Sequence, residues 1–304
     1  MIRTLIIPIL IFVSVQFACT RSQVDSVPDH YPNSSLLIEA SELNTRLEQS
    51  DLFLIDTRSE TVGKFIPGAI HFQSVERLSD PDHPVDGYLI PAEEFESLMR
   101  ELGLNRDDRV VIYDDGNALR AARLFYALEY HGFSNASILN GGWSNWQKEG
   151  YPVSEAIKTS SGVRGNFMAE VQEERICTFD EIREASQNPD KVILDVRSAE
   201  EYEGTRVRAE RGGHIPNAVN LEWSQVIESG DVPKFLPASQ IQAKYDVMGI
   251  TRDKEVIPHC QSNVRASHAY FTLRLMGYDS VRPYEGSWAE YGNREDAVIE
   301  GPES

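Results

Sequence analysis

One segment near the end of the chain combines a nucleophile with groups that bind anions. Pro258-His259-Cys260-Gln261-Ser262-Asn263-Val264-Arg265 places a thiol five positions before an arginine, with mostly polar side chains between them. The thiolate is the nucleophilic form of cysteine, and a cationic neighbour favours that form. The segment therefore predicts a reactive thiol, Cys260, ionised at neutral pH beside the positive charge of Arg265.

Hydrophobic patterns on both sides of this segment predict how it is positioned. Residues 256–257 are typical of a buried strand, and residues 266–273 have the apolar spacing of a helix with one buried face. In open α/β sheets, ligands bind beyond the carboxyl ends of the strands, where loops lead into helices. We therefore expect Cys260 to lie at a helix N-terminus, where backbone N–H groups and the helix dipole favour an anion.

The chain contains the same pattern twice. Residues 54–58 and 66–70 correspond to residues 194–197 and 214–219, and Trp143 recurs 145 positions later as Trp288. Each copy alternates β-branched runs with helical patterns, which predicts an α/β fold with a parallel sheet flanked by helices. We expect two tandem domains, residues 36–153 and 176–300, with a polar linker at residues 154–175.

The two copies differ at the position of the candidate nucleophile. In the first copy Asp115 occupies the place of the cysteine, and a carboxylate lacks the nucleophilic sulfur of a thiol. The pairs Asp56/Arg58 and Asp195/Arg197 occur in both copies. Because the copy without the thiol keeps its pair, we interpret both as structural ion pairs.

These motifs resemble those of the tandem-domain rhodaneses, a family of sulfurtransferases. The resemblance extends over residues 36–295 and rests on five motifs in order: Asp195-x-Arg197, Glu201-Tyr202-x-Gly204, Gly213-His214-Ile215-Pro216, Cys260-Gln261-x-x-x-Arg265 and Tyr284-x-Gly286-Ser287-Trp288. In that family the cysteine accepts sulfane sulfur and passes it to a nucleophile. The resemblance implies a persulfide on Cys260 and a first domain that is catalytically silent. The implied substrate-binding groups are the backbone of Gln261, Ser262, Asn263 and Val264 and the side chain of Arg265.

The loop favours thiosulfate as the sulfur donor, with 3-mercaptopyruvate as the alternative. Family members that use 3-mercaptopyruvate typically carry Cys-Gly-Ser/Thr-Gly-Val-Thr, whereas this loop has Gln261 and ends in Arg265, which suits a dianion. Glu201 argues the other way, because some thiosulfate-using relatives carry arginine there. The resemblance implies cyanide, in vitro, or a thiol as the acceptor.

Two other classes of function share part of this pattern. Cysteine-dependent phosphatases also place a Cys…Arg loop at a helix N-terminus, but with five residues between the two. Here four residues separate Cys260 from Arg265, and the smaller ring suits a single sulfur atom. A non-enzymatic sulfur carrier or binding protein of the cell envelope would keep both the fold and the thiol, so that alternative stays open.

The net charge limits the classes of molecule that the protein is expected to bind. The 304 residues carry a formal net charge of −19, which argues against nucleic acid or an anionic membrane surface as a partner. A small anionic donor responds instead to the local field of its pocket. We expect Cys177 to be a small, semi-buried hydrophobic residue. The spacing of the histidines and cysteines matches no metal site, so we expect neither a metal nor another cofactor.

The N-terminus is typical of an exported protein. Arg3 precedes an apolar run at residues 5–15, which is too short to span a bilayer but fits a signal-peptide core. Ala18-Cys19 resembles a bacterial lipoprotein cleavage site, although Gln16 departs from the aliphatic residue usual in that motif. We expect residues 1–18 to be a signal peptide and the protein to reside in the bacterial cell envelope. It would be either periplasmic or anchored to the membrane by a lipid on Cys19.

Overall fold

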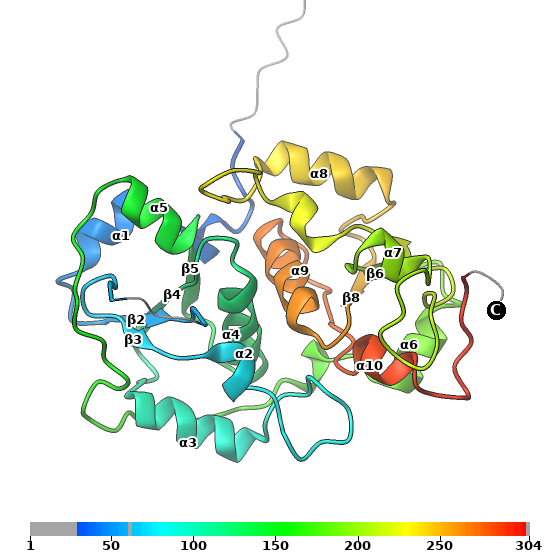
Figure 1. Ribbon diagram of the computed structural model, residues 1–304, viewed down its shortest axis with the longest axis horizontal. Coiled ribbons are helices and arrows are strands. Elements are labelled where there is room, and N and C mark those ends of the chain that lie inside the picture. The colour runs from blue at the N-terminus through cyan, green and yellow to red at the C-terminus, as the bar shows by residue number, and fades with distance from the viewer. Residues whose placement is uncertain (1–28, 60–62, 302–304) are drawn as a thin grey trace, which may run out of the picture.

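The first half of the chain forms a five-stranded parallel sheet with helices on both faces (Figure 1). The computed structural model describes residues 29–59 and 63–301. The strand order is β1-β5-β4-β2-β3, and the apolar side chains of β2 and β4 are buried on both faces. The elements are η1 (Ser34–Leu36), β1 (Leu37–Ile38), α1 (Ala40–Arg46), β2 (Leu52–Asp56), β3 (Ile70–His71), α2 (Ser74–Arg77), α3 (Ala92–Leu102), β4 (Arg109–Tyr113), α4 (Leu119–Tyr130), β5 (Ala136–Leu139) and α5 (Gly142–Lys148).

The second half repeats this architecture with a smaller sheet. Strands β7, β6 and β8 pair in that order and in parallel, and bridges at Val256–Val281 and Cys177–Tyr284 extend the sheet. The α/β prediction with two parallel sheets is therefore confirmed. The elements are η2 (Glu173–Arg175), α6 (Phe179–Ala185), β6 (Lys191–Asp195), α7 (Ala199–Tyr202), β7 (Val219–Asn220), η3 (Trp223–Val226), α8 (Ala238–Val247), β8 (Glu255–His259), α9 (Val264–Leu275) and α10 (Ser287–Tyr291).

Short sequence signals determine where two helices of the second half begin. Ser198 accepts a hydrogen bond from the N–H of Glu201, whose carboxylate accepts one from the N–H of Ser198. The same reciprocal capping box joins Thr178 and Glu181 at the start of α6. A capping box satisfies N–H groups that the helix itself leaves unpaired. In α7 it also fixes the backbone of Glu201, which proves important for the site.

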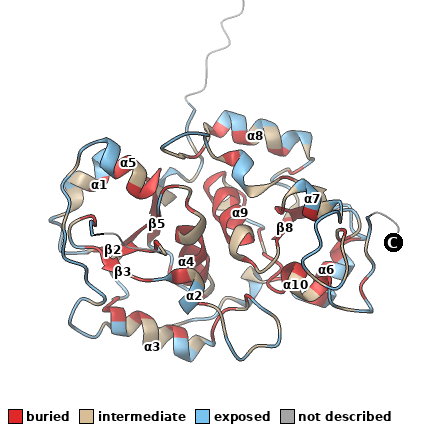
Figure 2. Ribbon diagram, in the orientation of Figure 1, coloured by how far each residue is buried: buried red, intermediate tan, exposed pale blue. Residues whose placement is uncertain are grey.

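Helices α4 and α9 join the two halves. They lie side by side between the two sheets, and both are largely buried (Figure 2). Phe125 meets Phe271 edge-on with 4.9 Å between ring centroids, and Tyr126 meets Tyr270 in the same way at 5.1 Å. Edge-to-face pairs of this kind add stability beyond the area they bury. Because each helix follows the candidate loop of its own copy, both loops lie at the interface between the two halves.

The segment expected to be a linker packs along the first half. The N–H groups of Ser161 and Gly165 donate to carbonyls in the last turn of α3, and the buried Phe167 packs against that helix. Phe167 escaped the sequence analysis because a single aromatic residue in a polar stretch forms no periodic pattern. The chain before the first strand also crosses to the second half, where Asn33 donates to the carbonyl of Arg274.

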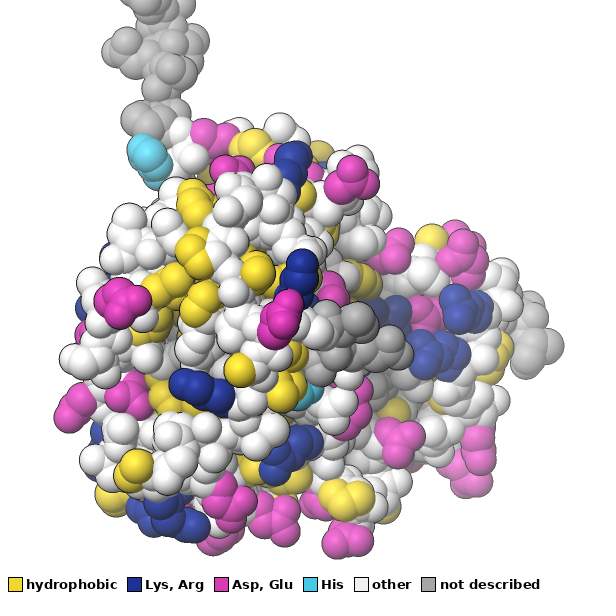
Figure 3. All heavy atoms as spheres, turned by 60° about the vertical axis from the view of Figure 1, so that its left-hand side comes forward, with side chains coloured by type: hydrophobic (Ala, Val, Ile, Leu, Met, Phe, Trp, Pro, Cys, Tyr) yellow, Lys and Arg dark blue, Asp and Glu magenta, His cyan; other side chains and the backbone are white. Residues whose placement is uncertain are grey.

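The surface carries charges of both signs. On the face shown in Figure 3, acidic and basic side chains are interspersed, so the negative net charge does not gather into one patch there. Within residues 29–59 and 63–301, no helix is both long and apolar enough to cross a membrane. The predicted signal peptide at residues 1–18 and the predicted lipidation site Cys19 lie outside the described residues.

Candidate active site

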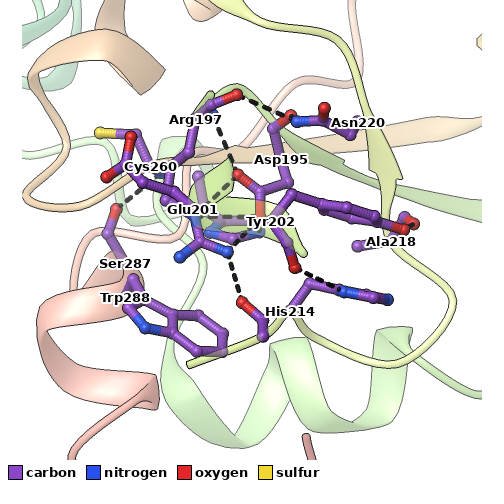
Figure 4. A network of polar contacts seen from close by, with 12 residues as sticks. Asp195, Arg197, Glu201, Tyr202, His214, Ala218, Asn220, Cys260, Ser287 and Trp288 are labelled. Atoms are coloured by element: carbon purple, nitrogen blue, oxygen red, sulfur yellow. Dashed lines mark hydrogen bonds and ion pairs between the residues drawn. The ribbon is translucent and has the colours of Figure 1, made fainter. Parts of the chain in front are cut away.

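Cys260 lies at the junction between β8 and α9, as the sequence predicts (Figure 4). The residue is only 1% exposed. Its backbone N–H donates to Oγ of Ser287 at 3.2 Å, and its carbonyl accepts from the N–H of Trp288 at 2.9 Å. The first turn of α10 therefore holds the backbone of the thiol-bearing residue in place.

The loop after Cys260 offers backbone donors to an anion. In the described part of the chain, no group accepts from the N–H groups of residues 261–265. Asn263 has a left-handed backbone with φ of +59°, so the chain turns sharply before it enters α9. A turn of this type makes a concave surface of N–H groups, and the N-terminus of the twelve-residue α9 adds partial positive charge.

The matching loop of the first copy is already filled by a carboxyl group. The side chain of Asp114 accepts hydrogen bonds from four backbone N–H groups at 2.9 to 3.4 Å. Asp115, which aligns with Cys260, is exposed, and the buried side chain of Asp114 fills the loop. His259 stands at the position of Asp114 in the second copy and provides no carboxylate. The four donors are Gly116, Ala118, Arg120 and Ala121.

The guanidinium of Arg265 is paired with Glu201. Nη1 and Nη2 donate to the two carboxylate oxygens at 2.6 and 3.0 Å, and Arg208 approaches the same carboxylate at 3.4 Å. Burial opposes ionisation of Glu201, but the hydrogen bonds and charge of Arg265 outweigh it and lower the pKa to about 2. The charge of Arg265 also acts on Cys260. The expected role of this arginine in substrate binding stays a prediction, and the structure shows that it also has a carboxylate partner.

A second buried ion pair supports the loop from beneath. The carboxylate of Asp195 accepts from Nε and Nη2 of Arg197, whose guanidinium lies 4.2 Å from the ring centroid of Trp288. Burial lowers the pKa of the neighbouring His259 to about 4, so that histidine is neutral. The same arrangement recurs in the first copy, where Arg58 pairs with Asp56. Both predicted structural ion pairs are therefore present.

Both halves of the chain match the same family of domains. The model of the rhodanese-like domain matches residues 39–149 and again residues 178–294. The chain belongs to the rhodanese-like family.

The rhodanese-like relatives include sulfurtransferases of two kinds. A thiosulfate sulfurtransferase of Azotobacter vinelandii is 33% identical over 274 residues, which cover 90% of this chain and 99% of that protein. The sulfur carrier protein TtuD of Thermus thermophilus is 34% identical over 256 residues, covering 80% and 85%. The crystal structure of SseA from Escherichia coli, a 3-mercaptopyruvate sulfotransferase, superposes with a TM-score of 0.73 at 28% identity, covering 84% and 99%. The protein is a sulfurtransferase.

The five residues that the sequence analysis assigned to substrate binding occupy different environments in this rhodanese-like site. Asn263 is fully buried and Gln261 donates from Nε2 to the carbonyl of Arg208 at 3.0 Å. Ser262 and Val264 are half-buried and contribute backbone donors. Their role as substrate-binding groups stays a prediction, as does the nucleophilic role of Cys260.

Several contributors to the site were missed at the sequence level. Ser287 and Glu201 stand inside motifs that were recognised, but no spacing rule predicts that one holds the backbone of Cys260 and the other pairs with Arg265. Asp114 adjoins the residue that was singled out. The capping-box spacing from Ser198 to Glu201 was a readable signal for the start of α7.

Cys177 has the environment of a structural residue. It is 1% exposed and packs in the apolar cluster beneath α6, and burial raises the pKa of its thiol to about 12. Cys177 and Cys260 are both free thiols. Cys177 was expected to be a semi-buried hydrophobic residue, and the structure buries it completely within the cluster.

Proposed function

We propose that this protein moves sulfane sulfur from thiosulfate to a thiophilic acceptor through a persulfide on Cys260. The observation that carries the proposal is the difference between the two loops. In the first copy the backbone donors bind the Asp114 carboxylate, whereas in the second copy they surround a cysteine and stay without an acceptor among the described residues. Such donors stabilise negative charge on the sulfur that the cysteine receives.

The proposed reaction has two displacements at sulfur. The thiolate of Cys260 attacks the outer sulfur of thiosulfate, a sulfur–sulfur bond forms on Sγ, and the bond to the sulfonate sulfur breaks with its electron pair leaving as sulfite. The total charge of −3 is the same before and after this step, and no proton is needed. Cyanide, or a thiolate in the cell, then takes the terminal sulfur and regenerates the thiolate.

The positive charge of Arg265 near Cys260 favours thiosulfate, a dianion. The pairing of Arg265 with Glu201 favours 3-mercaptopyruvate, the alternative donor. Because Glu201 offsets the charge of Arg265, a monoanionic donor such as 3-mercaptopyruvate gains a relative advantage. The relatives include enzymes named for each donor. We place thiosulfate first, because the loop itself carries an arginine and lacks the small neutral residues typical of the other group.

The first domain is proposed to be catalytically silent. Its loop contains no cysteine, and its backbone donors are used by Asp114. Packing of α4 against α9 gives this domain a structural task, because it covers the loop that carries Cys260. Its loop at residues 87–89 lies directly against the second domain.

Mass spectrometry and a donor panel test this proposal. The protein is treated with thiosulfate or with 3-mercaptopyruvate, and peptides containing Cys260 and Cys177 are weighed; release of sulfite or pyruvate is followed with cyanide present. We expect a gain of about 32 Da, one sulfur atom, on Cys260 alone, with sulfite release faster than pyruvate release. A large preference for 3-mercaptopyruvate would make it the donor. A persulfide that forms without turnover would identify a carrier, and no adduct from either donor would refute both readings.

We further propose that the protein acts in the bacterial cell envelope, either in the periplasm or attached to the membrane by a lipid on Cys19. The support is the sequence of residues 1–19. Cell fractionation of the wild type and of Cys19→Ala, with mass analysis of the mature N-terminus, tests it. A mature chain that begins at Met1 would refute export by this route.

A further inference from the structure

The contacts between the two domains are reciprocal. Glu285 follows Tyr284, which pairs with the second sheet. Its carboxylate accepts a hydrogen bond from the N–H of Leu89 in the first domain at 2.7 Å. Asn140 lies 145 positions earlier and its side-chain oxygen accepts from the N–H of Phe235 in the second domain at 3.1 Å. Each domain therefore presents equivalent elements to the other. Where equivalent residues differ, the difference indicates which groups are specific to the loop that carries Cys260.

Arg123 of the first domain faces the loop of Cys260. Its Nη2 donates to the carbonyl of Gly87 at 2.6 Å. Gly87 packs directly on the loop, since a Cβ on it would lie 2.4 Å from the carbonyl oxygen of Ser262. Arg123 and Cys260 are close enough to interact electrostatically. A cation of the silent domain is thus bonded to Gly87, which packs on the loop that carries the thiol.

The guanidinium of Arg123 is buried without a bound counter-charge. Arg123 is 0% exposed and forms no ion pair within the described residues. Its Nε and Nη1 have no hydrogen-bond partner among those residues. The hydroxyl of Tyr126 and the side-chain amide of Asn263 are likewise buried without partners. Glu285 is close enough to act on Arg123 electrostatically, but no ion pair joins them. A buried charge is costly unless a partner compensates it, so these donors suit an anion.

The silent side of the interface carries no such charge. His268 of α9 stands 145 positions after Arg123 and lies next to the backbone of Asn117, in the loop that Asp114 fills. Burial lowers the pKa of His268 to about 3, so it is neutral. Asn140, which is also neutral, replaces Glu285 on that side. The positive charge is therefore present where the thiol is and absent where the loop already holds a carboxylate.

We propose that Arg123 is a binding residue for anionic sulfur at Cys260, so that the first domain supplies part of the second domain's site. This inference rests on the proposed function and extends it. Nε and Nη1 of Arg123 would donate to the anionic end of the donor, and then to the terminal sulfur of the persulfide. Both Nη groups of Arg265 donate to Glu201, whereas Nε and Nη1 of the buried Arg123 have no hydrogen-bond partner among the described residues.

A pair of alkylating reagents measures the local charge without any sulfur donor. Iodoacetate is anionic and iodoacetamide is neutral, and the ratio of their rates at Cys260 reports the attraction of an anion to the thiol. In Arg123→Gln we expect that ratio to fall about tenfold and the KM for thiosulfate to rise by a similar factor. The neutral glutamine keeps a donor for the Gly87 carbonyl. In Arg123→Lys we expect the ratio to hold within about twofold while KM still rises, because an ammonium lacks the two fixed donors.

Two matched variants separate charge from packing. His268→Gln removes a buried side chain at the equivalent place of the same interface, and Arg106→Gln removes an exposed cation of the first domain. Both should leave the alkylation ratio unchanged. An unchanged ratio and KM in Arg123→Gln, or an unchanged KM in Arg123→Lys, would overturn the inference. If the wild type forms no persulfide, the proposed function fails, while the alkylation ratio still tests Arg123.

Discussion

Arg265 donates two hydrogen bonds to Glu201, at 2.6 and 3.0 Å, and the carboxylate that receives them is fixed by the capping box of α7. The side-chain exposure of Glu201 is 3%, so solvent screens this pair weakly. The cation adjacent to the thiol therefore has a permanent partner, and the net charge near Cys260 depends on both residues. In the first copy the equivalent arginine, Arg120, also binds a carboxylate, but that of Glu76 in α2, which is not the counterpart of α7.

Replacing Glu201 with Gln should strengthen the binding of an anionic donor. Glutamine can still accept one hydrogen bond from Arg265, so the guanidinium keeps its place, but the opposing negative charge is lost. We expect the KM for thiosulfate to fall severalfold, by about 3- to 10-fold, with a loss of thermal stability. Steady-state kinetics and a melting curve measure both. A rise in KM would mean that Glu201 serves mainly to orient the arginine.

Cys260→Ser should abolish sulfur transfer and leave the fold intact. A hydroxyl is close to a thiol in size, and the two hydrogen bonds that fix the residue involve only its backbone. We expect no adduct and no sulfite release above background, with a melting temperature close to that of the wild type. Cys177→Ser is the matched control and should keep its transfer activity. Activity that survives in Cys260→Ser would contradict the assignment of the nucleophile.

The fold was predictable because its signals are repeated and periodic. The buried run at residues 256–257 predicted a strand, and the spacing of residues 266–273 predicted α9. The duplication of the pattern made each half support the other. Short edge elements such as β3 and β7 are two residues long and give no periodic signal. Their positions follow from pairing with β2 and β6, which a local pattern does not contain.

The site was predictable only along one stretch of chain. Cys260 and its loop are contiguous, so strand, loop and helix could be read together. Glu201, Ser287 and Arg123 reach the loop from three other elements, and such proximity depends on tertiary packing. Asp114 shows the limit within a loop, because the side chain that turns inward to the N–H groups is one position away from the aligned residue.

Stability should fall as the pH drops below 6.5, because several histidines are buried in the neutral form. Burial lowers the pKa of His131 and His259 to about 4 and of His268 to about 3. The unfolded chain takes up protons on these residues below 6.5 and the folded chain does not, so the loss develops between pH 6.5 and about 4. Each histidine costs up to about 1.4 kcal/mol per pH unit in that window.

Urea unfolding at pH 7.5, 6.0 and 5.0 measures this effect. His268→Gln should reduce the dependence of the unfolding free energy on pH, and the exposed His30→Gln serves as the control. A free energy of unfolding that stays constant over this range would show that the buried histidines are protonated in the folded protein.

The two neighbouring aspartates of the silent loop should differ sharply in their effect on stability. Asp114→Ala leaves four backbone N–H groups without their acceptor, and we expect a loss of about 1–3 kcal/mol in the free energy of unfolding. Asp115→Ala changes an exposed side chain and should stay within about 0.5 kcal/mol. It should also keep most of the transfer activity. Near-complete loss of activity in Asp115→Ala would mean that the first domain takes part in the chemistry.

A cysteine placed in the loop of the first domain tests whether a thiol needs unoccupied backbone N–H donors around it to accept sulfane sulfur. In a Cys260→Ser background, Asp115→Cys alone should gain no sulfur from thiosulfate, because Asp114 still occupies the donors. Adding Asp114→His reproduces the His-Cys sequence of the second copy and frees those groups, so a gain of about 32 Da is expected on the new thiol. Peptide mass analysis distinguishes the two variants. Equal loading of both would show that the carboxylate of Asp114 does not keep the first loop silent.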